Sequence, residues 1–218
     1  MTALFSRQTS RGEVLSCGLK NGPQILVLQP LFDEANRCRR TIALMMRALA
    51  SRGIGTTLPD LPGLGESLAP LAETRWEDWQ TAVSDWVNDI RPVALAAFRG
   101  GALLDSVPGI VAHWRFAPET GARIVRDLER TRLTSSAADK DVLGGHKLAP
   151  AFIDALRTAD LPSHSLMRTV RLESDATDAD LHVPGSPLWR RAEPGEDAAL
   201  AEALAEDLSQ WINQCAAS

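Results

Sequence analysis

The segment 98–101 (FRGG) holds the residues with the clearest chemical potential in this sequence. An apolar run at 92–98 leads into it and predicts a buried strand, whereas 101–104 predicts the start of a helix. Arg99 is therefore expected on a strand-to-helix turn, at the edge of a sheet where ligands bind. Because its guanidinium stays protonated in proteins, Arg99 cannot act as a nucleophile.

Two roles remain open for Arg99. In the first, its guanidinium and the free N–H groups of the helix start bind a carboxylate or phosphate, while Gly100 and Gly101 let the ligand approach the backbone closely. In the second, Arg99 pairs with a local carboxylate such as Glu34 or Asp60 and only holds loops together. The residue types are compatible with both roles.

Two further loops are expected at the same edge of the sheet, at 29–40 and 60–67. The backbone N–H groups of Leu31 or Phe32 could stabilise an oxyanion. Glu34 and Asp60 are candidate catalytic carboxylates that could activate a water molecule. The candidate polar binding residues of the first loop are Asn36, Arg39 and Arg40. The alternative is that the acidic and amide side chains cap a helix and the arginines are solvated.

Strand and helix patterns alternate along the chain. This alternation predicts an α/β fold with a mainly parallel central sheet and helices on both faces. The length suits a single domain over 1–218, with a small insertion or cap at about 134–164. Expected strands lie at 13–19, 25–28, 56–58, 93–98, 110–114, 166–172 and 181–183. Expected helices cover 36–51, a segment opened by a capping box of Thr74 and Glu77, a segment after Pro118, and 196–213.

In an α/β-hydrolase the turn after the central strand reads G-x-S-x-G and presents a nucleophilic serine, where this chain has Arg99. The matching histidine should precede the last helix, and His182 is the histidine closest to that place. His182 is thus the third catalytic candidate, with the acidic residues of 175–180 able to orient it. The alternative is an ordinary strand residue, because a histidine without a serine or cysteine partner forms no catalytic system.

Composition excludes several classes of protein. The net charge of −5 disfavours a general nucleic-acid binder. No apolar run approaches the roughly 20 residues of a membrane span. The three cysteines lack metal-ligand spacing and read as reduced thiols, which predicts a cytoplasmic protein without a metal site or cofactor. The expected partner is a small-molecule substrate or an anionic ligand, and the oligomeric state is not predicted.

Four blocks of the sequence form a recognisable set. They are QPLFDEANRCRR at 29–40, DLPGLGES at 60–67, FRGGALL at 98–104 and PGSPLW at 184–189. Together they resemble the second type of exosortase A system-associated hydrolase. The resemblance implies an α/β-hydrolase fold, a link to exopolysaccharide and protein-sorting systems, and an arginine at the elbow as part of the family's pattern.

These observations support three hypotheses about function. The first is hydrolysis of an acyl ester or thioester without the usual serine, with Leu31, Phe32 or Arg99 stabilising the oxyanion. The second is a non-catalytic binder of an anionic small molecule. The third is a scaffold that recruits a partner through its surface.

Overall fold

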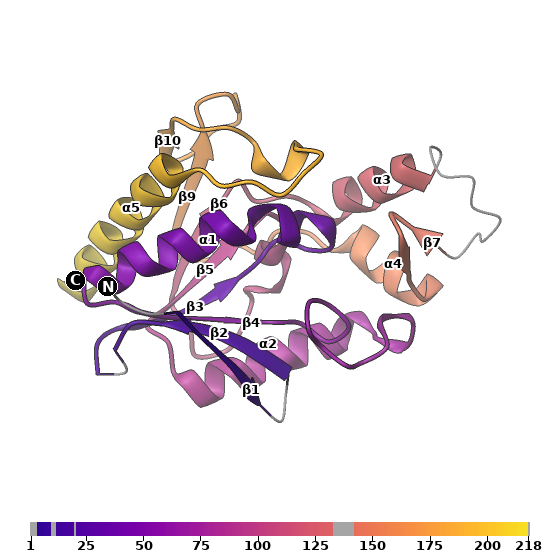
Figure 1. The fold of residues 1–218 in the computed structure, drawn as a ribbon, viewed down its shortest axis with the longest axis horizontal. Helices are drawn as coiled ribbons and strands as arrows, with labels where there is room; N and C mark the ends of the chain where they lie inside the picture. Colours follow the sequence, from indigo (N-terminus) through magenta and orange to yellow (C-terminus); the bar gives the residue numbers. More distant parts are fainter. Residues whose placement is uncertain (1–3, 10–11, 20, 133–141, 218) are drawn as a thin grey trace.

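The computed structural model describes residues 4–9, 12–19, 21–132 and 142–217. They form an eight-stranded sheet in the order β1-β2-β4-β3-β5-β6-β9-β10 (Figure 1). From β4 onward in this order, neighbouring strands pair in parallel, whereas β2 pairs antiparallel with both β1 and β4. The bounds are β1 Leu4–Thr9, β2 Gly12–Cys17, β3 Gln24–Leu28, β4 Gly55–Pro59, β5 Ala94–Phe98, β6 Ala112–Phe116, β9 Leu166–Leu172 and β10 Leu181–Val183.

Helices cover both faces of the sheet. On one face, α1 (Asp33–Ser51) packs beside α5 (Ala198–Ala217), and their apolar sides close one half of the core. On the other face lie α2 (Trp76–Ile90), α3 (Gly121–Arg132) and α4 (Pro150–Thr158). A mainly parallel sheet with helices on both faces is the fold class that the sequence predicts, so the prediction is confirmed. Such helices cover the apolar faces of the strands.

Beyond the carboxyl ends of the strands, α3 and α4 lie together with a small hairpin (Figure 1). The hairpin consists of β7 (Val142–Leu143) and β8 (His146–Lys147). Phe152 of α4 packs edge-on against Trp79 of α2, with a ring separation of 4.8 Å. The polar loop expected at 134–141 lies outside the described residues. That 134–164 is an insertion into one domain stays a prediction.

The chain that follows the elbow differs from the expectation. A helix was expected after Arg99, but the structure has a single 3-10 segment, η2 (Arg99–Leu104), which ends at Asp105. Two glycines at its start and the pair Pro108-Gly109 beyond it disfavour a longer helix. The remaining 3-10 segments are η1 (Leu71–Glu73) and η3 (Leu188–Arg190).

Two expected helix starts are also wrong. The helix α1 begins at Asp33, so Asn36 lies within its first turn instead of capping it. The capping box of Thr74 and Glu77 does not form, because α2 begins at Trp76 and the backbone N–H of Arg75 donates to Asp78 Oδ2 at 2.8 Å. The observed starts differ from the expected ones by three residues for α1 and one residue for α2, as is common at helix ends. None of the described helices is long and apolar enough to cross a membrane.

Candidate functional site

Arg99 lies at the carboxyl end of β5, where the chain turns sharply. Its φ of 51° is in the left-handed region, which non-glycine residues seldom adopt. Its side chain is only 8% exposed. Strained backbone of this kind is typical of the turn that carries the nucleophile in α/β-hydrolases. The turn therefore has the strained backbone of such an elbow, and the side chain that it carries is a guanidinium.

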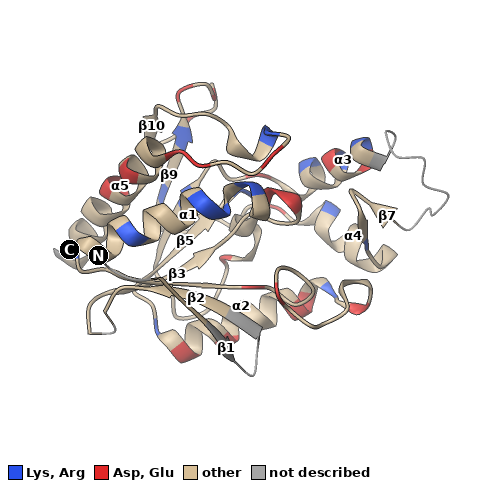
Figure 2. Ribbon diagram, in the orientation of Figure 1, with Lys and Arg blue, Asp and Glu red and all other residues tan. Residues whose placement is uncertain are grey.

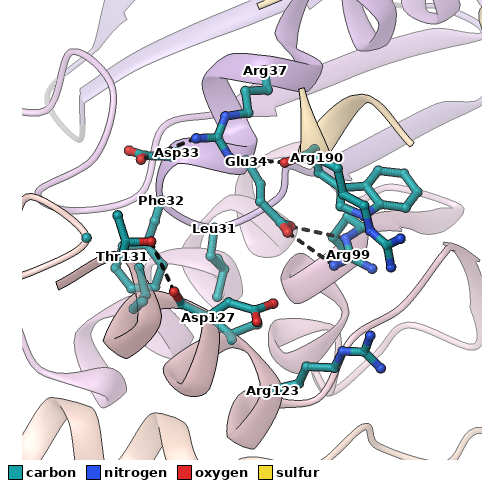
Figure 3. A pocket seen from close by; sticks show the side chains of 14 residues that line it. Leu31, Phe32, Asp33, Glu34, Arg37, Arg99, Arg123, Asp127, Thr131 and Arg190 are labelled. Atoms are coloured by element: carbon teal, nitrogen blue, oxygen red, sulfur yellow. Dashed lines mark hydrogen bonds and ion pairs between the residues drawn. The ribbon is translucent and has the colours of Figure 1, made fainter. Parts of the chain in front are cut away.

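Several protein groups hold the guanidinium of Arg99, and Figure 3 shows its contacts with Glu34. Nε and Nη2 each donate at 3.1 Å to one carboxylate oxygen of Glu34. Nη1 donates to the carbonyl of Ala117 at 3.1 Å and lies 3.4 Å from Glu119 Oε2. The guanidinium carbon stands 4.4 Å above the ring of Trp189. The structure thus favours the second of the two roles, a local ion pair.

A cavity of about 230 Å³ opens beside this ion pair. Its walls come from the loop after β3, the start of α1, η2, α3 and η3. The burial of Glu34 in this wall raises the pKa of its carboxyl, although Arg99 acts in the opposite direction. Basic and acidic residues gather around the end of α1 that faces α3 (Figure 2). The residues lining this first cavity include Leu31, Phe32, Asp33, Glu34, Arg37, Arg99, Arg123, Ile124, Asp127, Leu128, Thr131, Trp189 and Arg190.

Phe32 and Asp33 also border a second cavity, of about 420 Å³, which is lined in part by Asn36 and Arg39. Beneath it, Asp60 Oδ1 accepts hydrogen bonds from Gln29 Nε2 at 3.3 Å and Arg39 Nη1 at 3.2 Å. The other carboxylate oxygen, Oδ2, accepts from the backbone N–H of Glu66 at 2.9 Å. Asp60 thereby fixes the 60–67 loop to β3 and α1.

A third cavity, of about 320 Å³, lies where β6 and β9 end, and Arg99 and Trp189 line it as well as the first. Arg171 and Asp175 form an ion pair in its wall, at 2.7 Å. Burial alone would raise the pKa of Asp175, but hydrogen bonds from Thr177 and the pair with Arg171 lower it to about 2. The turn after β9 is therefore held by a carboxylate that stays ionised.

The structure separates the other candidate residues. His182 is an exposed residue of β10, with Nε2 3.0 Å from the carbonyl of Thr177, and it lines none of these three cavities. Arg40 points to Glu196, at 2.7 Å, and is 70% exposed. Leu31 and Phe32 line the first cavity, and Phe32 has a φ of 56°. Of the carboxylates named from the sequence, Glu34 is the one that reaches Arg99.

Protein atoms occupy the space that a side chain on Gly100 or Gly101 would need, so this space is not open to a ligand. A Cβ on Gly101 would lie 2.5 Å from the carbonyl oxygen of Gln29. A Cβ on Gly100 would lie 2.5 Å from Ile124 Cδ1 and 3.0 Å from Leu31 Cγ. These glycines allow the elbow to pack closely on β3 and α3.

Sequence reasoning missed two contacts of Arg99. Glu119 follows β6, so the rule that placed the other loops at this edge could have found it. Trp189 belongs to the PGSPLW block, which gave no sign of a contact with Arg99. No serine, cysteine or histidine is among the described residues that line the first cavity. The arrangement provides a buried ion pair and a mixed polar and apolar pocket.

Comparisons with known proteins place the fold. No protein-family model and no curated protein matches this sequence. Among solved structures, it is similar to Est1E from Butyrivibrio proteoclasticus, with 14% identity, a TM-score of 0.63, and coverage of 96% of this chain and 99% of that chain. Alpha/beta hydrolase domain-containing protein 10 from mouse shares 15% identity, with a TM-score of 0.62 and coverage of 99% of each chain.

The esterase domain of a Rhodothermus marinus protein is 15% identical, with a TM-score of 0.61 and coverage of 98% of both chains. These likenesses extend along nearly the whole chain. At such identities they concern the fold and not the reaction. This chain therefore has the α/β-hydrolase fold.

Proposed function

We propose that this chain binds a small molecule in the first cavity and performs no acyl-enzyme chemistry. The observation that carries the proposal is the ion pair of Arg99 with Glu34, which stands where a serine hydrolase presents its nucleophile. A protonated guanidinium held by two carboxylates can neither attack a carbonyl nor give up a proton. The first cavity lies beside the turn where this fold usually binds its substrate, whereas the residues at that turn do not support acyl-enzyme formation.

The walls of the first cavity suit a ligand with apolar and polar parts. Leu31, Ile124 and Leu128 supply apolar surface, and Trp189 supplies an aromatic wall. Because Glu34 and Glu119 already balance the charge of Arg99, the preference for an anionic ligand loses its main support there. Arg190, which borders the first and third cavities, is the better candidate for a polar contact with a ligand.

Two measurements test this proposal. A fluorophosphonate probe should leave the native protein unlabelled, and stoichiometric labelling of any serine would overturn the claim. Native mass spectrometry of the purified protein should detect a bound small molecule that is lost in Ile124→Trp, where the larger side chain fills the cavity. An Asp154→Ala variant on the exposed side of α4 serves as the control. Equal occupancy in Ile124→Trp and Asp154→Ala would refute binding in this cavity.

A second candidate function is favoured by the raised pKa of Glu34. A carboxylate in a cavity wall with a raised pKa could accept a proton from water during ester or thioester hydrolysis. Leu31 and Phe32 line the same cavity, and their backbone N–H groups could receive the oxyanion. Neither Asp60 nor His182 lines this cavity. Glu34→Gln should then lower kcat for p-nitrophenyl butyrate, with KM unchanged, whereas Asp127→Asn should change neither. Equal kcat in Glu34→Gln and the parent would exclude this candidate.

We also propose a link to exosortase and exopolysaccharide systems and a cytoplasmic location. The four sequence blocks support the link, and the three thiols support the location. Deletion of the gene should change exopolysaccharide production in its host. Restoration by the parent gene, but not by an Ile124→Trp variant, would connect the phenotype to the cavity. An unchanged polysaccharide yield would contradict the link.

A further inference from the structure

A second buried polar cluster lies away from the three cavities, on the sheet face that carries η2. It consists of Asp105 at the end of η2, His113 and Arg115 on β6, and His164 just before β9. Asp105, His113 and Arg115 are buried almost completely, and the side chain of His164 is 13% exposed. Ionisable groups in such a place must balance one another, because water does not reach them.

Arg115 balances the charge of Asp105. Its Nε donates to Oδ2 at 2.7 Å, and its Nη2 donates to Oδ1 at 2.9 Å and to the carbonyl of Pro162 at 2.7 Å. His164 Nε2 lies 3.0 Å from Asp105 Oδ1, the distance of a hydrogen bond that the imidazole donates. With both histidines neutral, the cluster carries no net charge.

His113 is the strained member of this cluster. Its ring is stacked on His164 with 3.5 Å between the ring centres and 5° between the planes. Its Nδ1 has no hydrogen-bond partner and lies 4.0 Å from Asp105 Oδ2. Burial, and next the neighbouring His164, lower the pKa of His113, while Asp105 acts in the opposite direction. A proton on Nδ1 would add a second positive charge beside Arg115.

Asp105, His113 and His164 offer donor atoms within 4.8 Å of one another, a spacing that also suits metal ligands. The stacking argues against this use, because two parallel rings 3.5 Å apart cannot both direct a lone pair at one ion. Both oxygens of Asp105 are moreover bonded to Arg115. The cluster therefore suits a response to protons better than metal binding.

We propose that this cluster is an acid-sensitive latch on the segment that leaves the elbow. Asp105 directly follows η2, whose first residue is Arg99, so the cluster ties the elbow to β6 and to the start of β9. Protonation of the buried His113 gives the cluster a second cation beside Arg115, against the single carboxylate of Asp105. The charged ring is then repelled by Arg115 and leaves the stack with His164, and the segment 105–111 is released. This latch operates whatever the first cavity binds.

Hydrogen exchange of the full chain at pH 7.5 and pH 5.5 tests the latch. After correction for the intrinsic exchange rate, amides of 99–111 should lose about tenfold in protection at pH 5.5, because this pH lies about one unit below the ordinary pKa of a histidine that opening exposes to water. His113→Gln, which cannot take the proton, should remove this loss. His182→Gln, at an exposed histidine, should keep it. Equal protection at both pH values, or the same loss in His113→Gln, would overturn the proposal.

A titration of the unaltered protein keeps the proposal testable if His113→Gln does not fold. The ring resonances of His113 and His164 are followed by NMR together with the amide protection of 99–111. The latch requires that His113 takes up its proton in the same pH interval in which the segment opens. Protonation of His113 with no change in the protection of 99–111 would refute it.

Discussion

Arg99 combines a strained backbone with a side chain that several protein groups hold in place. Its backbone is held at a φ of 51°, and its guanidinium joins two carboxylates, a carbonyl and an indole ring. A serine at this position would leave Glu34 without the cation that it pairs with, whereas Glu119 would keep Arg123. The residue type therefore explains the acidic neighbours, and the neighbours explain why the guanidinium is held rigidly.

Removal of this cation is expected to be costly. Arg99→Met keeps most of the side-chain volume but leaves Glu34 unpaired, so the free energy of unfolding should fall by about 3 kcal/mol. Urea unfolding measures the change. The double variant Arg99→Met with Glu34→Gln should recover part of the loss, because the buried charge is then removed as well. Arg190→Met, near the same cavity, is the control and should change stability by less than about 0.5 kcal/mol. A loss of stability in Arg99→Met no larger than in Arg190→Met would contradict a stabilising role for the ion pair of Arg99 with Glu34.

At the scale of elements, the turn at Arg99 depends on the close packing of η2 against the end of β3. Gly101 faces the backbone carbonyls of Leu28 and Gln29, which belong to the end of β3 and the loop after it. Backbone atoms of a central parallel strand cannot shift without disturbing both neighbouring strands. The position of the Arg99 turn is thus fixed by the absence of a side chain at Gly101.

Gly101→Ala should destabilise the protein by about 1–3 kcal/mol, because its Cβ would overpack against these carbonyls. Gly195→Ala is the matched control, since the atom that a Cβ would meet there is Nη1 of the flexible side chain of Arg191. Thermal and urea unfolding of both variants provide the comparison. Equal stability of the two variants would show that η2 can move away from β3.

The turn after β9 predicts a specific acid dependence. The pKa of Asp175 is lowered to about 2 in the folded chain, so its stabilising contribution is fully present above its ordinary value near 3.8. The contribution is lost as the pH falls from about 4 to 2, because the unfolded chain then binds the proton more readily. Asp175→Asn should flatten the stability profile in this interval and leave its slope above pH 5 unchanged. An unaltered acid slope in the variant would contradict the assignment.

At the scale of the whole molecule, a polar junction ties α5 to the sheet. Asp207 of α5 accepts from Trp114 Nε1 on β6 at 2.8 Å and from Arg168 Nη2 on β9 at 2.6 Å. These contacts join the C-terminal helix to two central strands that are 93 and 39 residues away in sequence. The junction closes the core on the face shared with α1.

Asp207→Ala should lower the free energy of unfolding by about 2–4 kcal/mol, because it leaves the Arg168 guanidinium and the buried Trp114 N–H without their acceptor. Glu206→Ala, at the preceding and exposed position of the same helix, should have little effect on the free energy of unfolding. Denaturant unfolding followed by tryptophan fluorescence measures both. A similar small effect in the two variants would show that apolar packing alone holds α5.

The sequence by itself determined the fold class and most of the buried strands and helices, but not the 3-10 segment after Arg99. Continuous apolar runs such as 25–28 and 93–98 predict strands buried on both faces, and the 3.6-residue spacing of Trp79, Val83 and Trp86 predicts the inner side of a helix. The position of Arg99 on the turn after the central strand followed from these patterns, as did its inability to act as a nucleophile. Such properties are local, since periodicity and residue chemistry are contained in a few neighbouring residues.

Only the tertiary structure decided which side chains meet. Glu34 and Arg99 are 65 residues apart, and their contact depends on the register of β3 and β5 and on α1 beginning at Asp33. The early end of η2, which places Asp105 beside His164, depends on contacts with β6 and on the chain before β9. His182 lies away from the first cavity because β10 is the edge strand of the sheet. Ion pairs of this kind require distances of a few ångströms, which no pattern of residue types in one chain specifies.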